Sequence, residues 1–217
     1  MSGGSAPAGP PPPDPVARTR HDLHAVAELL LAGPQYRRAG TIRLRVTPGG
    51  FGTIAEPQVR VDGGDLVTEG PRLPLSETTL QRLGEQAGLD VGAPAGVYAD
   101  GSGARPEDPV AVDKAVAAAL AGWLGTGDAA LREFAPDQTP VLWPEHFDLG
   151  ISLGEVNYGV SPGDAYLAEP YAYIGPWTPR QGEFWNAPFG AVRPAARFGG
   201  TAELVAFFEA GRAAAAG

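Results

Sequence analysis

The order of helical and extended patterns constrains the fold of this chain most strongly. Residues 16–31 place apolar side chains at helical spacing, whereas TIRLRVTPGG (41–50) alternates apolar and arginine side chains as a half-buried strand does. Further helical stretches run from Ser76 to Ala87, from about Asp108 to Phe134 and from Thr201 onward, with extended patterns between them. Strand groups separated by helices without regular alternation predict an α+β fold, a mainly antiparallel sheet packed with several helices.

Glycine and proline set the expected boundaries of these elements. Residues 1–15 hold Gly, Ser, Ala and Pro with one Asp, so they are predicted to be a disordered tail, and 16–217 to form a single domain. Gly33-Pro34 is expected to end the first helix, and Gly88 the second. The third helix is expected to break near 125–127, where two glycines flank a threonine, and residues 62–64 (DGG) predict a hairpin turn.

The composition excludes several classes of function. With 16 Lys and Arg against 25 Asp and Glu, the net charge is −9, which argues against nucleic-acid and anionic-membrane surfaces. The absence of cysteine excludes disulfides, thiolate nucleophiles and Cys-ligated metals. Because no apolar run approaches membrane-spanning length and the first residues do not resemble a secretory signal, a cytoplasmic location is expected.

The segment from residue 141 to 153 (VLWPEHFDLGISL) has the highest local concentration of ionisable and aromatic side chains. If it forms one strand, Trp143, Phe147 and Leu149 share the core face, and His146 and Asp148 project together from the other. His146 then becomes the candidate general acid or base, since imidazole titrates near neutral pH, and Asp148 would orient it. Whether the protein is an enzyme stays open at this stage.

Aromatic residues gather downstream, as ten of the chain's 18 Phe, Trp and Tyr residues lie between Trp143 and Phe189. Tyr and Trp suit the walls of a ligand pocket, although the same rings also suit a core. The Asp of SPGD (161–164) and the Glu that precedes Pro170 have plainer explanations as a turn cap and a solvated carboxylate. The candidate ligand-binding residues are Glu145, Asn157, Tyr158, Asp164, Glu169, Tyr171, Tyr173, Trp177 and Trp185.

The three histidines permit an alternative site. His21 and His24 lie at i and i+3 on the first predicted helix and therefore share a face. Together with His146 and Asp148 they would make a ligand set suited to zinc or another divalent transition metal. HxxH is a far weaker signal than HExxH, so the cofactor stays unknown.

Three strings resemble a family of bacterial proteins of unknown function, chiefly actinobacterial: VLWPEHFDLGISL (141–153), NYGVSPGD (157–164) and EPYAYIGPW (169–177). RLRVTPGGFGT (43–53) and FWNAPFG (184–190) resemble one subgroup of it. The resemblance implies that the following residues belong to one unit: Trp143, His146, Asp148, Ser161, Asp164, Glu169 and Trp177. It carries no catalytic role, and Glu145 stands where some relatives have a second histidine.

Three hypotheses follow. The first is a small-molecule-binding protein whose aromatic pocket surrounds His146 and Asp148. The second is a metal-dependent enzyme that uses His21 and His24 as well. The third is a structural or partner-binding protein in which the dense segment is a packed hairpin with satisfied polar groups.

Overall fold

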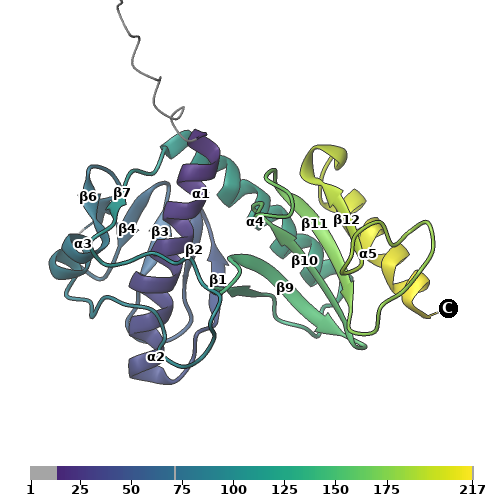
Figure 1. Ribbon diagram of the computed structural model, residues 1–217, viewed down its shortest axis with the longest axis horizontal. Helices are drawn as coiled ribbons and strands as arrows, with labels where there is room; N and C mark the ends of the chain where they lie inside the picture. The colour runs from purple at the N-terminus through teal and green to yellow at the C-terminus, as the bar shows by residue number, and fades with distance from the viewer. Residues whose placement is uncertain (1–13, 71, 217) are drawn as a thin grey trace, which may run out of the picture.

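Two antiparallel meanders of five strands each lie side by side in one ten-stranded sheet (Figure 1), so the predicted α+β fold is confirmed. The computed structural model describes residues 14–70 and 72–216. The first meander comprises β1 (Leu44–Thr47), β2 (Gly50–Thr53), β3 (Arg60–Asp62), β4 (Asp65–Val67) and β5 (Arg72–Pro74). The second comprises β8 (Val141–Trp143), β9 (Asp148–Leu153), β10 (Val156–Ser161), β11 (Tyr171–Pro176) and β12 (Ala191–Pro194).

The two meanders join through β1 and β8. Their register contains the single pair Leu44–Leu142, and both side chains are buried. Helix α4 (Lys114–Phe134) contacts β1 and β2 of the first meander as well as β9 and β10 of the second. It therefore bridges the joint where the strand pairing is shortest.

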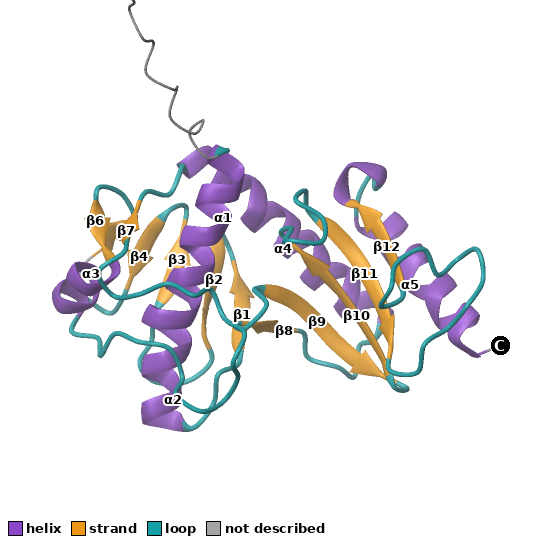
Figure 2. Ribbon diagram, viewed as in Figure 1, coloured by secondary structure: helices purple, strands orange, loops and turns teal. Residues whose placement is uncertain are grey.

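Each meander follows a helix and precedes another one. Helices α1 (Pro15–Val26) and α2 (Gly33–Ala39) come before β1, and α3 (Leu80–Ala87) follows β5. Helix α4 comes before β8, and α5 (Thr201–Ala216) follows β12 after a short 3₁₀ turn, Ala195–Arg197. In Figure 2, α4 and α5 lie behind β9–β12. Within the described ranges no helix combines the length and apolarity needed to cross a bilayer.

The N-terminal boundary lies near the expected place. The predicted disordered tail falls on residues outside the described ranges, except for Asp14 and Pro15. Pro15 opens α1, and the Asp14 carboxylate caps the helix by accepting a hydrogen bond from the Val16 N–H, at 3.2 Å.

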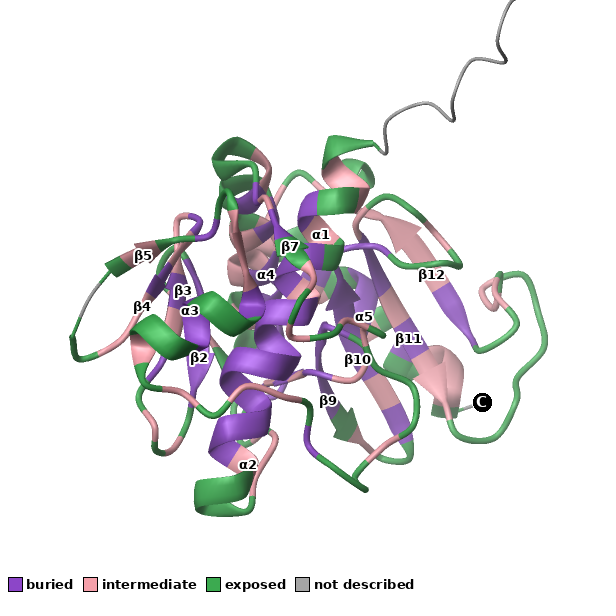
Figure 3. Cartoon of the chain, turned by 60° about the vertical axis from the view of Figure 1, so that its left-hand side comes forward, coloured by how far each residue is buried: buried purple, intermediate pink, exposed green. Residues whose placement is uncertain are grey.

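The first helix does not end at Gly33-Pro34 as predicted. It continues through a π-helical stretch, Ala27–Ala32, into α2 and ends at Gly40, which has φ 71°. The Gly33 N–H bonds to the Glu28 carbonyl, five residues back, and this wider turn accommodates Pro34 in the first turn of α2. A Cβ at position 33 would clash with the Gly92 carbonyl oxygen, so the glycine lets a loop pack against this buried stretch (Figure 3).

Helix α4 is also longer than predicted, because it is not broken at residues 125–127. It starts later, at Lys114, where the Asp113 carboxylate caps the N–H groups of Ala115 and Val116. Gly127 lies against Val160 of β10, and a Cβ there would overlap the valine side chain. The glycine is therefore a contact point between helix and sheet and not a helix breaker.

The second predicted helix begins later than expected. Thr79 caps α3 by accepting a hydrogen bond from the Arg82 N–H, and Gly88 ends the helix with φ 67° as predicted. The residues before it, Thr78–Thr79 (β6), pair with Pro109–Val110 (β7) in a separate two-stranded sheet.

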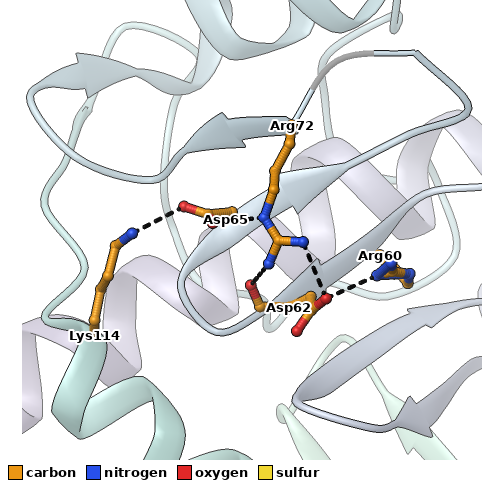
Figure 4. Close-up of polar contacts among 5 residues, drawn as sticks. All are labelled: Arg60, Asp62, Asp65, Arg72 and Lys114. Carbon is orange, nitrogen blue, oxygen red and sulfur yellow. Dashed lines mark hydrogen bonds and ion pairs between the residues drawn. The ribbon is translucent and has the colours of Figure 1, made fainter.

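The predicted hairpin at residues 62–64 is present between β3 and β4. Ion pairs connect its two aspartates to neighbouring elements (Figure 4). Arg72 of β5 donates from Nε to Asp65, at 2.8 Å, and also contacts Asp62. Lys114 Nζ lies 3.3 Å from the other oxygen of Asp65. These cations lower the pKa of Asp65, Arg72 first and Lys114 second, and they connect β5 and the start of α4 to the hairpin.

We expect two glycines of α4 to respond oppositely to alanine. Gly127→Ala should destabilise the protein by about 1–3 kcal/mol, because its methyl group must displace Val160. Gly122→Ala should stabilise it by roughly 0.5–1 kcal/mol, because a Cβ there meets nothing within 4 Å and alanine favours helix. Urea unfolding of both variants measures the difference, and equal effects would contradict the close packing of α4 on β10.

Candidate functional site

Residues 141–153 form a hairpin and not the single strand that was predicted. β8 and β9 pair antiparallel, with Trp143 opposite Asp148, and residues 144–147 make the turn. His146 is therefore an exposed turn residue, whereas Asp148 is a buried strand residue. The parity argument that put both on one strand face fails because the chain reverses between them.

Packing of Phe147 holds this turn in place. Phe147 has φ 52°, a conformation that is uncommon for a large side chain. Its ring is 2% exposed, stacks on His24 of α1 with ring centroids 5.5 Å apart, and meets Phe51 of β2 edge-on at 5.3 Å. Burial between these rings offsets the backbone strain and places the hairpin turn beside α1.

A cavity of about 900 Å³ lies between α1 and the face of β9–β11 opposite to α4 and α5. We call it the main cavity. It is lined by Ala17, Arg20, His21, His24, Asp100, Gly101, Ser102, Glu145, His146, Phe147, Asp148, Asn157, Ser161, Gly163, Asp164, Ala165, Tyr171, Tyr173 and Phe189. Its walls therefore come from both halves of the chain.

A second hollow, the side cleft, has a volume of about 340 Å³. It is lined by Trp143, Glu145, His146, Asp148, Gly150, Ile151, Ser152, Asn157, Tyr173 and Trp177. Half of these residues also line the main cavity, so the two hollows meet around Asp148 and Tyr173.

The Tyr173 side chain crosses the sheet to reach Asp148. In the strand register, Tyr173 of β11 lies opposite Gly159 of β10, which lies opposite Gly150 of β9. A Cβ at Gly159 would come within 2.5 Å of the Tyr173 hydroxyl oxygen, and one at Gly150 within 2.8 Å. The two glycines thus leave room for the ring, whose hydroxyl donates a hydrogen bond to Asp148 Oδ2.

Asp148 is a buried carboxyl at the site. Burial raises the pKa of its carboxyl to about 6, and the negative charge of Glu145 acts in the same direction. The Tyr173 hydrogen bond and the charge of His146 oppose this rise. Burial and the neighbouring Asp148 raise the pKa of Tyr173 well above its usual value. Asp148 can therefore exchange a proton near neutral pH while Tyr173 stays protonated.

The four residues of the proposed metal site, His21, His24, His146 and Asp148, all line the main cavity. The Nε2–H of His24 donates to the Pro144 carbonyl at 2.7 Å, so this nitrogen carries a proton, and burial lowers the pKa of the ring. Across residues 14–70 and 72–216, no group of three or more His, Asp or Glu side chains is arranged to hold a metal ion. The structure therefore brings these residues to one cavity without assembling them as a ligand set.

The remaining predicted residues around the cavities have defined partners. Asn157 Oδ1 accepts hydrogen bonds from Ser152 Oγ, at 2.7 Å, and from the Trp177 indole, at 3.1 Å. Tyr171 donates to Asp164 Oδ2 at 2.6 Å, while Asp164 Oδ1 accepts from the Tyr166 and Leu167 N–H groups. Asp164 is thus engaged in holding its loop, whereas Asn157 lines both hollows.

Three predicted ligand-binding residues line neither hollow. Tyr158 points to the opposite face of β10 and packs on Phe134, with ring centroids 4.8 Å apart, because neighbours along a strand alternate sides. Trp185 packs against Phe184 beside the core, and Glu169 is exposed in the loop before β11. The structure assigns Tyr158 and Trp185 to packing.

Sequence reasoning brought only His21 and His24 of α1 to the site, and it missed Arg20 and the long loop before β7. Arg20 donates to the Ala168 carbonyl and so connects α1 to the loop that follows β10. Ser102 lies in the wall because its N–H donates to the buried Glu28 carboxylate at 2.9 Å. The length of this glycine- and proline-rich loop, residues 91–109, is the sequence signal that could have indicated it, because long loops in compact domains are often functional.

Asp148→Asn should change the pH dependence of stability. Well below pH 3.8, the ordinary pKa of the carboxyl, Asp148 is neutral in the folded and the unfolded chain, so its elevated pKa costs nothing. As pH rises from about 4 to about 6, Asp148 ionises in the unfolded chain before it does in the folded one, so the wild type loses stability, and above about pH 6 the variant should have gained about 3 kcal/mol relative to it. Urea unfolding at pH 4 and pH 8 measures most of this gain.

The matched control is Asp100→Asn, which removes an exposed carboxylate that lines the same cavity. Its stability relative to the wild type should be the same at both pH values. A pH-independent difference for Asp148→Asn as well would show that Asp148 is not the group that titrates near neutral pH.

No family model, no curated protein and no solved structure matches this chain.

Proposed function

We propose that this protein binds a small organic molecule in the main cavity and the side cleft, around Asp148 and Tyr173. The observation that carries the proposal is a buried carboxyl with a pKa of about 6 at the meeting point of two hollows, the larger of about 900 Å³. Concave sites with a few convergent polar groups and a perturbed pKa are typical of ligand sites. Tyr171, Tyr173 and Phe189 supply aromatic wall.

Unsatisfied polar atoms favour ligand binding over a purely structural role. A packed hairpin would satisfy its own buried groups, yet among the described residues Asp148 Oδ1 and Glu145 Oε2 are buried without a hydrogen-bond partner. Buried polar atoms are almost always paired in proteins, and leaving one unpaired costs about 1–3 kcal/mol. A ligand that supplies donors would recover that cost.

If the ligand is transformed, His146 and Asp148 stay the candidate acid–base groups. Asp148 is the stronger candidate, because it is 9% exposed and lies beneath the hollows, whereas His146 is exposed at their edge. Tyr173 then acts as a positioning residue that holds the Asp148 carboxylate.

Location and partners are further parts of the proposal. A net charge of −9 and the absence of cysteine support a cytoplasmic protein that does not bind nucleic acid. Membership in the bacterial family that the three motifs resemble is proposed on those motifs alone.

A thermal-shift screen against a metabolite collection of anions, neutral compounds and cations tests the proposal. Hits should bind Tyr173→Phe at least about fivefold more weakly, because the variant loses the hydroxyl that holds Asp148. Tyr166→Phe is the matched control, since this exposed tyrosine lines neither hollow. The proposal fails if no compound raises the melting temperature, and a zinc-dependent rise that chelation abolishes would favour the metal-dependent alternative.

A further inference from the structure

The two unpartnered carboxylate oxygens limit the chemistry of the ligand. Asp148 is 9% exposed, and in the described part of the chain its Oδ1 and the Oε2 of Glu145 are both buried without a donor. Glu145 and Asp148 both line the main cavity and the side cleft. A carboxylate accepts hydrogen bonds, so the missing partners are donors.

The other walls of the side cleft favour positive charge. Among its described lining residues, His146 is the one basic side chain, beside two carboxylates. Trp143, Tyr173 and Trp177 also line it, and the faces of such aromatic rings attract cations. Arg43 already lies over the Trp143 ring, 5.8 Å from its centroid.

Among the described residues that line the main cavity, Arg20 is the one Lys or Arg, and it has a hydrogen-bond partner outside the pair of carboxylates. Arg20 donates to the Ala168 carbonyl and so holds α1 to the loop after β10. Among the described residues no hydrogen bond or ion pair joins Arg20 to Asp148 or Glu145. Protonation would turn one of the two unpartnered oxygens into a donor that itself needs an acceptor, whereas an ammonium or guanidinium group has several N–H donors.

From this arrangement we infer that the ligand carries a cationic nitrogen group, an ammonium, amidinium or guanidinium, which donates hydrogen bonds to Asp148 and Glu145 beside the rings of the side cleft. The inference rests on the proposed function and narrows its ligand class. Charge-assisted hydrogen bonds of this kind are shorter and stronger than neutral ones. They would also stabilise the ionised form of Asp148.

Two series of probes matched in shape test the inference by isothermal titration calorimetry at pH 7.5. The first is benzamidine, benzamide and benzoate, and the second is 2-phenylethylamine, 2-phenylethanol and phenylacetate. In each series the cation should bind at least tenfold more tightly than its neutral and anionic partners. Asp148→Asn and Glu145→Gln should each weaken the cation at least tenfold, while Asp100→Asn, which removes an equal charge from the main cavity, should change it less than twofold.

The outcomes separate the inference from the proposed function. Neutral or anionic probes that bind as tightly as the cations overturn the inference and leave the pocket intact. Equal losses in Asp148→Asn and Asp100→Asn overturn it too, because they show a general charge effect and not a contact. If none of the six probes binds, the compounds found in the metabolite screen test the inference instead. Compounds that bind without a cationic nitrogen overturn the inference. An empty metabolite screen overturns the inference together with the proposed function.

Discussion

The narrow joint between β1 and β8 is the constraint on which the rest of the structure depends. A single register pair, Leu44–Leu142, links the two meanders, so strand hydrogen bonds contribute little there. Burial of these leucines together with α4, which contacts strands on both sides, supplies the cohesion that the short ladder lacks. Gly127 lets α4 approach β10 closely enough to do so. The main cavity depends on this joint, because its walls come from both halves of the chain.

The candidate site follows from this arrangement. Since α4 and α5 cover one face of β9–β12, the other face is left for polar and aromatic side chains. The first half of the chain then provides α1 as the facing wall, and the contacts of Phe147 with His24 and Phe51 position the hairpin turn against it. The buried carboxyl of Asp148 thus depends on packing between elements that lie far apart in the sequence.

Local sequence signals predicted which helices and strands form better than they predicted where each one begins and ends. The hairpin at residues 62–64 and the capping glycine Gly88 both appear as expected, because each depends on neighbours a few residues away. Pro34 and Gly127 misled because their usual effect on a helix is offset by a π-helical turn in one case and by contact with Val160 in the other. Local signals failed at the site too. The predicted pairing of His146 with Asp148 assumed one continuous strand, whereas residues 141–153 form a hairpin.

The sequence by itself determined the α+β class, the concentration of polar and aromatic side chains between residues 141 and 177, and the choice of Asp148, Tyr171 and Tyr173 as candidate site residues. Those features depend on residue type and on spacing along the chain. Tertiary structure alone decided that Tyr173 is the partner of Asp148, that Tyr158 belongs to the core and that α1 closes the cavity. The physical reason is that a carboxyl's partners and its pKa are set by burial and by contacts across strands, which spacing along one strand does not encode.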